Sequence, residues 1–302
     1  MLDVLNIGLI SVDLIFANLA KFPELGKEVQ CKDFMIKPGG AVNTATALAK
    51  LGLSSTLVTT VGDDMLGNLL IDQLKKTGLN LSGFIQDTKY RTSVSAVLSV
   101  GKERGFATYF AASDDEAIMK RIEQLMPQCR HVHAYMLDVP RIPIVDIAKK
   151  YNKSISIDTS WDDNIKLEDL KPYMEKCDIF FTNEIESCNI TGKSNVGEAM
   201  DELMKHAKLV VLKLGSKGSM VGYENEIIRV PAVEVGEVKD TTGAGDLYAA
   251  GFIYGYLKGW DIKKTAQFAS ASGSVAVTFY GGTDEKYNLD LVSEYAKKIE
   301  AC

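Results

Sequence analysis

The sequence predicts a doubly wound α/β fold, in which helices flank a mostly parallel sheet. Short apolar runs rich in β-branched residues alternate along the chain with segments that have the periodicity of amphipathic helices. This alternation is expected when helices connect parallel strands of one sheet. A chain of 302 residues with 46% hydrophobic and 25% charged content can build one large core or two smaller ones. Because no linker, repeat or low-complexity tract divides it, we expect a single domain over residues 1–302.

The individual elements follow from length and periodicity. Segments of strand length that are apolar and β-branched lie at residues 4–9, 55–61, 131–134, 154–157, 179–181 and 209–212. Segments with helical spacing of apolar residues lie between them at 42–51, 67–77, 142–151 and 198–205.

Two regions, residues 13–36 and 92–111, break this rhythm. Both contain alternating apolar and polar residues, which is typical of antiparallel strands that have one buried face. Because the two regions are similar in character, we expect them to pair into a small β-strand lid over one end of the main sheet. The alternative is that each region forms an ordinary edge hairpin.

Charge and composition exclude several classes of protein. The formal net charge of −6 leaves no overall positive field that would attract nucleic acid or an anionic membrane. The first residues carry an acid, Asp3, where a signal peptide would have basic residues, and the apolar helical stretch at 247–257 is too short to span a bilayer. The five cysteines are scattered without a Cys-x-x-Cys pair. We expect a cytoplasmic protein with no nucleic-acid partner and no membrane span.

A turn of small residues runs directly into an apolar helix late in the chain. Gly243, Ala244 and Gly245 let the backbone turn tightly and leave the first amide groups of the helix unpaired, which forms an anion site. Asp246 follows in the first helical turn, where its carboxylate could orient an attacking hydroxyl and accept its proton. A base beside an anion site suits phosphoryl transfer. On these residues alone, Asp246 could equally serve only as a helix cap.

A second glycine-containing turn lies near the N-terminus. Gly39 and Gly40 precede a predicted helix whose first turn contains Asn43. Glycine lets a ligand approach the backbone closely, and an amide side chain can both donate to and accept from hydroxyl groups. The pattern suits recognition of a polyol, although a plain strand-to-helix turn would look the same.

Together these turns resemble the signatures of a known family. Gly-Gly-Ala-Val-Asn-Thr-Ala at residues 39–45, Val-Gly-Asp-Asp at 61–64 and Asp-Thr-Thr-Gly-Ala-Gly-Asp at 240–246 have the order and spacing of the ribokinase-like (PfkB) carbohydrate kinases. The resemblance extends to about Gly282. It implies a ribokinase-like fold and an ATP-dependent sugar kinase, of the ribokinase or fructokinase kind, that phosphorylates a hydroxyl of a small carbohydrate. The cofactors that it implies are ATP and Mg²⁺.

The resemblance also implies roles for individual residues. The catalytic residues would be Asp246 as the base, with Gly243, Ala244 and Gly245 forming the anion hole. The residues that bind the sugar substrate would be Asp13, Gly39, Gly40 and Asn43.

A nucleotide and metal site is implied in the same way. Asn183 and Glu186 resemble the family's Asn-x-x-Glu element and would act near Mg²⁺, with Glu186 binding through water. The segment after residue 212 resembles the nucleotide loop, although a plain β-turn is the alternative. Its candidate contacts to ribose and phosphates are Lys213, Gly215, Ser216 and Gly218. Asp240 and Thr242 resemble positions that hold a monovalent cation, such as K⁺, in some members.

Other functions stay open. A nucleoside (adenosine-type) kinase of the same family would be favoured if the lid aromatics Phe16, Phe34 and Tyr109 lined the pocket. A catalytically inactive sugar-binding relative is the third possibility, since fold alone does not guarantee chemistry. Retention of Asp246 beside its glycines argues against it. The apolar outer face of the lid also predicts a homodimer formed through the lid.

Two further patterns do not support a site. Residues 187–194 miss the Walker A pattern, because Ser187 stands where its first glycine should be. His131 and His133 point the same way on a predicted strand, but no third ligand with suitable spacing accompanies them. We expect these histidines to be packed or exposed rather than metal-bound.

Overall fold

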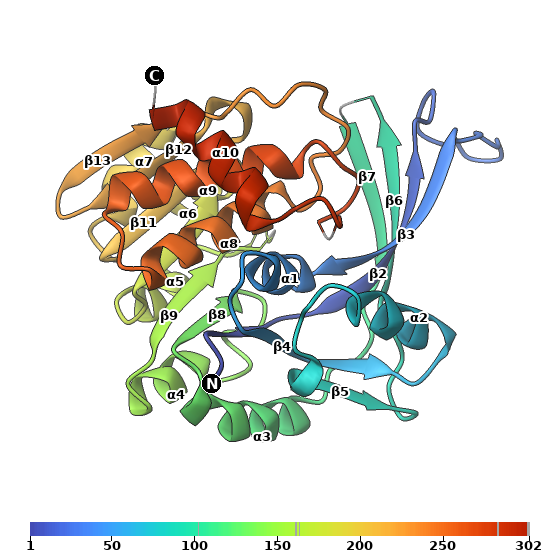
Figure 1. Ribbon diagram of the computed structural model, residues 1–302, viewed down its shortest axis with the longest axis horizontal. Coiled ribbons are helices and arrows are strands. Elements are labelled where there is room, and N and C mark those ends of the chain that lie inside the picture. Colours follow the sequence, from blue (N-terminus) through green and yellow to red (C-terminus); the bar gives the residue numbers. More distant parts are fainter. Residues whose placement is uncertain (102, 161, 163, 283, 301–302) are drawn as a thin grey trace.

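The computed structural model describes residues 1–101, 103–160, 162, 164–282 and 284–300. Within these residues a nine-stranded sheet has the order β13-β12-β11-β10-β9-β8-β1-β4-β5, and a separate four-stranded sheet has the order β3-β2-β6-β7 (Figure 1). This architecture confirms the predicted fold class, a mostly parallel sheet flanked by helices with a second, smaller sheet.

The main sheet contains all six predicted strands. Its members are β1 (Val4–Ile7), β4 (Ser55–Gly62), β5 (Phe84–Asp87), β8 (His131–Tyr135), β9 (Ser154–Asp158), β10 (Ile179–Asn183), β11 (Leu209–Lys213), β12 (Ser219–Tyr223) and β13 (Glu226–Val230). The strands from β11 to β5 run parallel, whereas β12 and β13 are antiparallel. The sequence analysis did not predict β5, β12 and β13. The edge strands β5 and β13 are partly exposed and of mixed polarity, whereas β12 is a short, buried strand that follows β11 after a turn.

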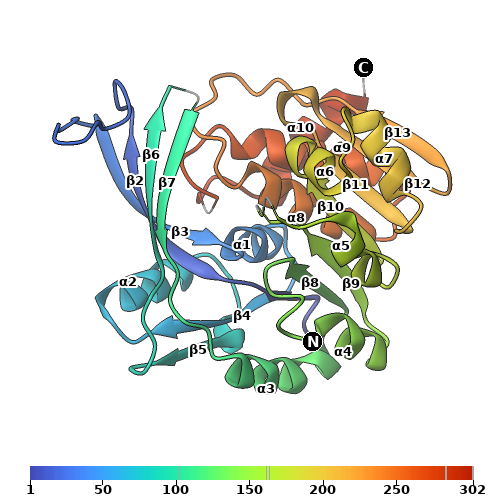
Figure 2. The same ribbon diagram turned by 180° about the vertical axis from the view of Figure 1, so that it is seen from behind.

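Helices cover both faces of this sheet. They are α1 (Val42–Lys50), α2 (Met65–Leu74), α3 (Asp115–Leu125), α4 (Ile144–Lys150), α5 (Leu167–Met174), α6 (Glu184–Thr191), α7 (Val196–Leu203), α8 (Ala244–Leu257), α9 (Ile262–Ala276) and α10 (Leu289–Glu300). One apolar core joins α1, α8, α9 and α10 to the sheet, and another joins α3, α4, α5 and α7 to it. The first group lies in front in Figure 1, and the second is seen from the other side in Figure 2.

The small sheet is built from the two regions that broke the rhythm. It contains β2 (Ile10–Ala17), β3 (Asp33–Gly40), β6 (Val94–Val100) and β7 (Glu103–Tyr109). Strand β2 pairs with β3 antiparallel and with β6 parallel, so it joins regions that are far apart in sequence. The sheet projects beyond the body in both views (Figures 1 and 2). Lys102, in the predicted lid, and Cys302 lie outside the described residues.

The two faces of the small sheet differ. Ile15 and Val97 are paired neighbours on the inner face, where they pack with Tyr280 of the body. On the outer face, the rings of Phe16 and Phe34 lie 5.1 Å apart between centroids, and Phe34 is 52% exposed. The alternation of inner and outer residues therefore leaves aromatic side chains on the face away from the body.

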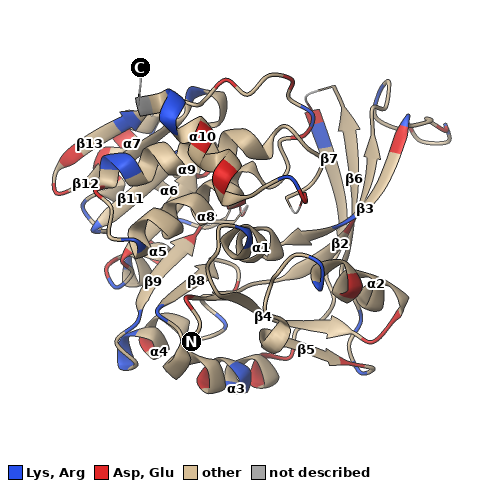
Figure 3. Cartoon of the chain, viewed as in Figure 1, with Lys and Arg blue, Asp and Glu red and all other residues tan. Residues whose placement is uncertain are grey.

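Charged residues of both signs are interspersed over the outer elements. Along α3, for example, acidic and basic residues follow one another (Figure 3). In the part of the chain that the structure describes, no helix is sufficiently long and apolar to traverse a bilayer.

Candidate active site

Polar side chains meet where four adjacent parallel strands end. Tyr135, Asp158, Asn183 and Lys213 are the last residues of β8, β9, β10 and β11. The strand register pairs Tyr135 with Asp158, and Asn183 with Lys213. Carboxyl ends of parallel strands are where open α/β sheets bind their ligands. The candidate site therefore lies at this edge of the main sheet.

The glycine turn before α8 faces the same edge. Gly243 precedes the helix with φ of 76°, a left-handed conformation that favours glycine. A Cβ atom there would come within 2.9 Å of the Gly282 Cα, so space as well as conformation requires glycine. The Ala244 amide donates to the Thr241 carbonyl at 3.3 Å. The next amide groups belong to a first helical turn, which has no acceptors within its own helix, and this arrangement suits an anion.

Asp246 is held in a fixed orientation in that first turn. Its two carboxylate oxygens accept hydrogen bonds from the Asn43 amide and from the Tyr135 hydroxyl, each at 3.0 Å. The Thr44 hydroxyl donates to the Asp246 carbonyl at 3.2 Å. Burial raises the pKa of Asp246 above its ordinary value, although Asn43, Lys213 and Tyr135 act in the opposite direction. A carboxylate that is both oriented and more basic than usual can act as a proton acceptor.

Asp13 faces this carboxylate from the inner side of β2. It accepts a hydrogen bond from the Ser11 hydroxyl at 2.7 Å. Burial raises the pKa of Asp13 to about 6, against the opposing effect of Ser11, and the negative charges of Asp246 and Asp240 raise it further. A Cβ atom on Gly39 would overlap the Asp13 carboxylate, so this glycine makes room for the acid.

Gly40 and Asn43 form the turn into α1. Gly40 has φ of 78°, and a Cβ atom there would lie 2.6 Å from the Leu9 carbonyl oxygen. The Asn43 amide group donates to Asp246, while its Oδ1 is buried with no hydrogen-bond partner among the described residues. A Cβ atom on Gly282 would overlap the Asn43 Cγ, so the loop at Gly282 packs directly on this side chain.

Lys213 forms a buried ion pair with Asp158. Its ammonium lies 2.8 and 2.7 Å from the two carboxylate oxygens. Burial raises the pKa of Asp158 to about 6, against the opposing effect of Lys213. Burial alone would lower the pKa of Lys213, but the negative charges of Asp158, Glu186 and Asp246 together outweigh burial and hold that pKa above its ordinary value. A Cβ atom on Gly245 would lie 3.6 Å from the Lys213 Nζ, so the ammonium borders the glycine turn.

Asn183 and Glu186 lie at the beginning of α6, beside this pair. The Asn183 side-chain oxygen caps the helix by accepting from the Glu186 amide at 2.9 Å. The Thr159 hydroxyl donates to the Glu186 carboxylate. Over the described ranges, no three His, Cys, Asp or Glu residues converge as a metal cluster would. The single carboxylate of Glu186, beside Asn183, fits Mg²⁺, because Mg²⁺ is usually held by one or two carboxylates together with phosphates and water.

The inner face of the small sheet also contacts the glycine turn before α8. Arg104 of β7 lies 2.5 Å from an oxygen of Asp240 and donates to the Thr241 hydroxyl at 2.6 Å. The Asp240 carboxylate also accepts the amides of Thr242 and Gly281, at 2.8 and 2.9 Å. The Thr242 hydroxyl is buried without a partner among the described residues. Asp240 thus anchors the turn from several sides.

Comparison with known proteins identifies the family. The description "pfkB family carbohydrate kinase" matches residues 1–287. The chain belongs to this family. It is therefore a kinase, a phosphotransferase with an alcohol group as acceptor, and ATP binding is typical of its family.

Relatives of this kinase differ in the acceptor that their names state. A nucleoside kinase from Methanothermobacter thermautotrophicus is 30% identical over 309 residues, covering 99% of this chain and 96% of that protein. An ATP-dependent 6-phosphofructokinase from Thermoanaerobacterium thermosaccharolyticum is 27% identical over 305 residues, covering 96% and 92%. The structure of Arabidopsis thaliana ribokinase complexed with ribose and ATP shares the fold, with a TM-score of 0.83 at 23% identity and coverage of 98% and 99%.

The remaining candidate contacts to the nucleotide lie in the turn after β11. Gly215 and Ser216 are exposed, and a Cβ atom on Gly215 would meet only open space. Gly218 is buried, and a Cβ atom there would overlap the Val230 carbonyl oxygen. Packing against β13 therefore explains Gly218, whereas Gly215 and Ser216 are free to approach a ligand.

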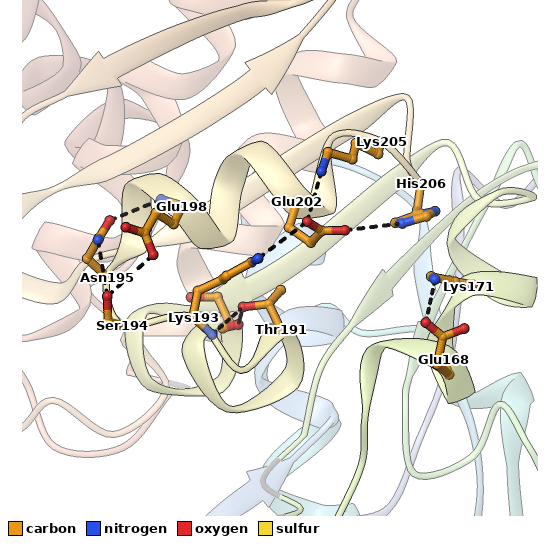
Figure 4. A network of polar contacts seen from close by, with 11 residues as sticks. Glu168, Lys171, Thr191, Lys193, Ser194, Asn195, Glu198, Glu202, Lys205 and His206 are labelled. Atoms are coloured by element: carbon orange, nitrogen blue, oxygen red, sulfur yellow. Dashed lines mark hydrogen bonds and ion pairs between the residues drawn. The ribbon is translucent and has the colours of Figure 1, made fainter.

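The segment that resembles Walker A without matching it belongs to a different region. Figure 4 shows Lys193 directed to Glu202, at 3.7 Å, and Ser194 bonded to Glu198, at 3.3 Å. The Thr191 hydroxyl donates to the Ser187 carbonyl at the end of α6. Lys193 thus lies in the loop between α6 and α7 and pairs with Glu202 of α7.

The two strand histidines of this kinase are packed in the interior. His131 bonds to the hydroxyls of Ser154 and Ser156, both at 2.8 Å, and His133 bonds to Ser156 at 2.8 Å. Burial lowers the pKa of His131 to about 3, so its imidazole is neutral at physiological pH. Hydrogen bonds to serines account for both ring nitrogens of His131 and for the Nδ1 of His133, whose Nε2 has no partner among the described residues.

Sequence reasoning missed Tyr135, Thr44, Asp158 and Arg104. Tyr135 and Asp158 each follow a predicted strand by one residue, which is a usable signal, because the ends of parallel strands point to the site. Thr44 adjoins Asn43 in the first turn of α1. Nothing in the sequence around Arg104 indicated a role at the site, because its strand, β7, is brought over the body only by its pairing with β6.

Proposed function

We propose that this kinase transfers the γ-phosphoryl group of ATP to a hydroxyl of a small carbohydrate, in the manner of a ribokinase or fructokinase. One observation carries the proposal: the oriented Asp246 carboxylate lies in the first turn of a helix, bonded to Asn43 and close enough to Asp13 and to the Lys213 ammonium for their charges to act on one another. A base, an anion site and hydroxyl-binding groups in one place are what sugar phosphorylation needs.

The acceptor-side groups suit a polyol. Asp13 is a buried carboxylate on the inner face of β2, and the Asn43 Oδ1 has no partner among the described residues. Both accept hydrogen bonds, and a polyol offers several hydroxyl donors. A hydroxylated ligand would satisfy buried acceptors that otherwise carry a desolvation cost.

The proposed reaction uses Asp246 as the base. As the acceptor oxygen forms a bond to the γ-phosphorus, its proton passes to Asp246, and the bond from that phosphorus to the leaving ADP oxygen breaks. The amides of Ala244, Gly245 and Asp246 would stabilise the negative charge that develops. Mg²⁺ bound with the nucleotide, near Asn183 and Glu186 and through water, would neutralise phosphate oxygens.

A nucleoside kinase is the second candidate, and one side chain favours it. Phe106 pairs with Val97 and therefore lies on the same face as Asp13, where it is 61% exposed and could stack on a nucleobase. The aromatics that we expected to decide the question do not reach that face. Phe16, Phe34 and Tyr109 lie on the outer face of the small sheet, because side chains alternate along each strand.

A panel assay separates the candidates. Sugars, sugar phosphates and nucleosides would each be offered at saturating MgATP, with ADP release measured against a blank without acceptor. We expect turnover with a small sugar, unchanged in Phe106→Ala. Turnover confined to nucleosides and reduced in Phe106→Ala would establish the second candidate. If no compound exceeds the blank and ATP does not bind, the proposal fails, and an inactive sugar-binding relative remains.

The proposal extends to a monovalent cation, such as K⁺, at Asp240 and Thr242. The unpartnered Thr242 hydroxyl supports it. A cation there would share the Asp240 carboxylate with Arg104. We expect turnover to be faster in K⁺ than in tetramethylammonium at equal ionic strength, and equal rates would remove the cation from the proposal.

We also propose that two copies associate through the lid. The outer face of the small sheet carries the aromatic side chains of Phe16, Phe34 and Tyr109, which are partly or largely exposed, whereas Leu14 and Ile36 on the same face pack against the core beside α2. Soluble proteins usually cover such a surface and its strand edges, often with a second copy.

A further inference from the structure

The Lys213–Asp158 pair differs from the other ion pairs around it. Both side chains are largely buried, with exposures of 15% for Lys213 and 3% for Asp158. The nearby pair of Lys217 and Glu184 has a similar distance, 2.9 Å, but exposures of 69% and 41%. The Lys213 side chain is therefore directed inward, across the end of β10, rather than into solvent.

Stability alone does not explain this pair. Removing two charges from water is costly, and a well-packed apolar pair of similar volume is often as stable. The surroundings add to the cost, because Glu186 and Asp246 place two more negative charges near the pair. Lys213 is thus a buried positive group among the carboxylates of Asp158, Glu186 and Asp246.

The position of the ammonium indicates what it can contact. The Lys213 Nζ borders the Gly245 backbone, since a Cβ atom on Gly245 would lie 3.6 Å from it and 3.7 Å from the Lys213 Cδ. Gly245 is part of the turn whose amides suit an anion. A ligand anion at this helix terminus would therefore adjoin the ammonium, and an ammonium is a common point-charge partner for phosphate.

We infer that Asp158 is a positioning residue, which holds the Lys213 ammonium beside the anion hole so that Lys213 contacts the terminal phosphoryl group of a nucleoside triphosphate. The inference rests on the proposed function and deepens it. Asp158 itself touches no reacting atom. It receives Lys213 with both carboxylate oxygens and thereby fixes a side chain that would otherwise be flexible.

This role has a specific signature in nucleotide binding. A group that contacts the terminal phosphoryl group contributes to the binding of ATP but not of ADP, whereas a purely structural role would affect both nucleotides equally. The readout is therefore the ratio of the dissociation constants for ADP and for a non-hydrolysable ATP analogue. Isothermal titration calorimetry with Mg²⁺ gives both constants on the intact protein.

Three variants test the two residues. Lys213→Met removes the charge at similar length, Asp158→Asn removes the partner at similar size, and Asp158→Glu keeps the charge but shifts the ammonium by about one methylene. We expect each to reduce the preference for the ATP analogue by roughly tenfold or more, as for the loss of one charged hydrogen bond, with ADP affinity little changed. Lys217→Met is the matched control, and its ratio should equal that of the wild type.

A double variant tests whether Asp158 acts through Lys213. Adding Asp158→Asn to Lys213→Met should produce no further change in the ratio, because there is no ammonium left to position. The double variant also leaves neither member of the Lys213–Asp158 pair charged without its partner, so it remains informative if Asp158→Asn alone does not fold. If the double variant prefers the ATP analogue even less than Lys213→Met alone does, Asp158 contacts the nucleotide independently of Lys213, and the inference is overturned.

Two failures are distinguishable. In the first, the wild-type protein phosphorylates an acceptor, but Asp158→Glu and Lys213→Met weaken the binding of ADP and of the ATP analogue equally, or leave the binding of both unchanged. The positioning role is then wrong, while the proposed function stands. If the wild type binds no nucleotide and releases no ADP with any acceptor, the proposed function fails, and the inference fails with it.

Discussion

Arg104 and Asp240 form an ion pair that joins the small sheet to the turn before α8. The Arg104 Nη2 lies 2.5 Å from an Asp240 oxygen, and Asp240 is 4% exposed. The same carboxylate accepts the Thr242 and Gly281 amides. One side chain of β7 therefore contacts the carboxylate that anchors the glycine turn before α8.

Replacing Arg104 with Met should loosen this contact without changing Asp246. Because the small sheet also carries Asp13, we expect the KM for the acceptor to rise by about tenfold or more, as for loss of one charged hydrogen bond, with a smaller change in the KM for ATP. Steady-state kinetics with each substrate varied measures both constants. Arg130→Met is the control, since Arg130 pairs with Asp3 at 2.9 Å at the opposite end of the strands. Equal changes in both variants would contradict the expectation.

Asp246→Asn should separate chemistry from binding. The amide keeps the size of the side chain and can still bond to Asn43 and Tyr135 after reorientation, but it cannot accept the acceptor proton. We expect kcat to fall by about 10² to 10⁴, with both substrates still bound. Rapid-quench kinetics together with calorimetric binding measures the two effects. If the variant kept more than about a tenth of wild-type kcat, Asp246 would not be the base.

The raised pKa of Asp13 predicts a pH dependence. Below about pH 6 this carboxyl is protonated and accepts hydroxyl hydrogen bonds less well, so binding of the acceptor without nucleotide should strengthen as pH rises through about 6. In Asp13→Asn this step should disappear, with a loss of roughly 1 to 3 kcal/mol of acceptor binding. Titrations between pH 5 and pH 8 measure it. A step of unchanged size in the variant would assign the titration to another group.

The same pKa predicts a gain in stability for that variant. A carboxyl whose folded pKa exceeds its unfolded value contributes stability below the unfolded pKa, and this contribution is lost as pH rises through about 6. The neutral Asn escapes this loss. Asp13→Asn should therefore have a higher Tm than the wild type at pH 8, with a smaller difference at pH 5. A lower Tm at pH 8 would show that Asp13 contributes to folding beyond its charge.

The two glycines that flank Ala244 should respond differently to alanine. Gly243→Ala would introduce strain at φ of 76° and a contact of 2.9 Å with the Gly282 backbone, at a cost of roughly 1 to 3 kcal/mol. Gly245→Ala meets only an ordinary contact with Lys213 at 3.6 Å. We expect Gly243→Ala to lower Tm and abolish most turnover, and Gly245→Ala to keep Tm while it weakens the binding of ATP. Calorimetry and kinetics on both variants compare them, and the reverse order would disprove this account.

The proposed association through the lid predicts a surface variant that dissociates. Phe34→Lys places a charge on the exposed outer face, away from Asp13, and should convert a dimer to a monomer at micromolar concentration. Sedimentation velocity measures the change, and Ile227→Lys, on the edge strand β13 of the main sheet and 41% exposed, is the comparison. Wild-type protein that is monomeric at this concentration would remove the proposed dimer.

The sequence predicted the elements with the strongest periodicity and the residues with the strongest local chemistry. The six buried strands were found because each is a short apolar run. Asp246 was proposed as the base because small residues precede it at a predicted helix start, and the structure does place it in the first turn of a helix. Edge strands such as β13 were missed because their exposed faces resemble loops. Long-range partners were also missed. Nothing near Lys213 in the sequence indicates that its partner is Asp158, 55 residues earlier.

The register of β2 places the acceptor-side carboxylate on the small sheet, whereas Asn43 and Asp246 belong to the body. Any swing of the small sheet would carry Asp13 away from Asn43 and Asp246 and divide the proposed sugar pocket in two. The acceptor site would be complete only in the closed arrangement, and opening would separate its residues. Under the proposed function, ATP in the open enzyme would meet no assembled acceptor site, and a finished product would be released by the same movement that ends catalysis.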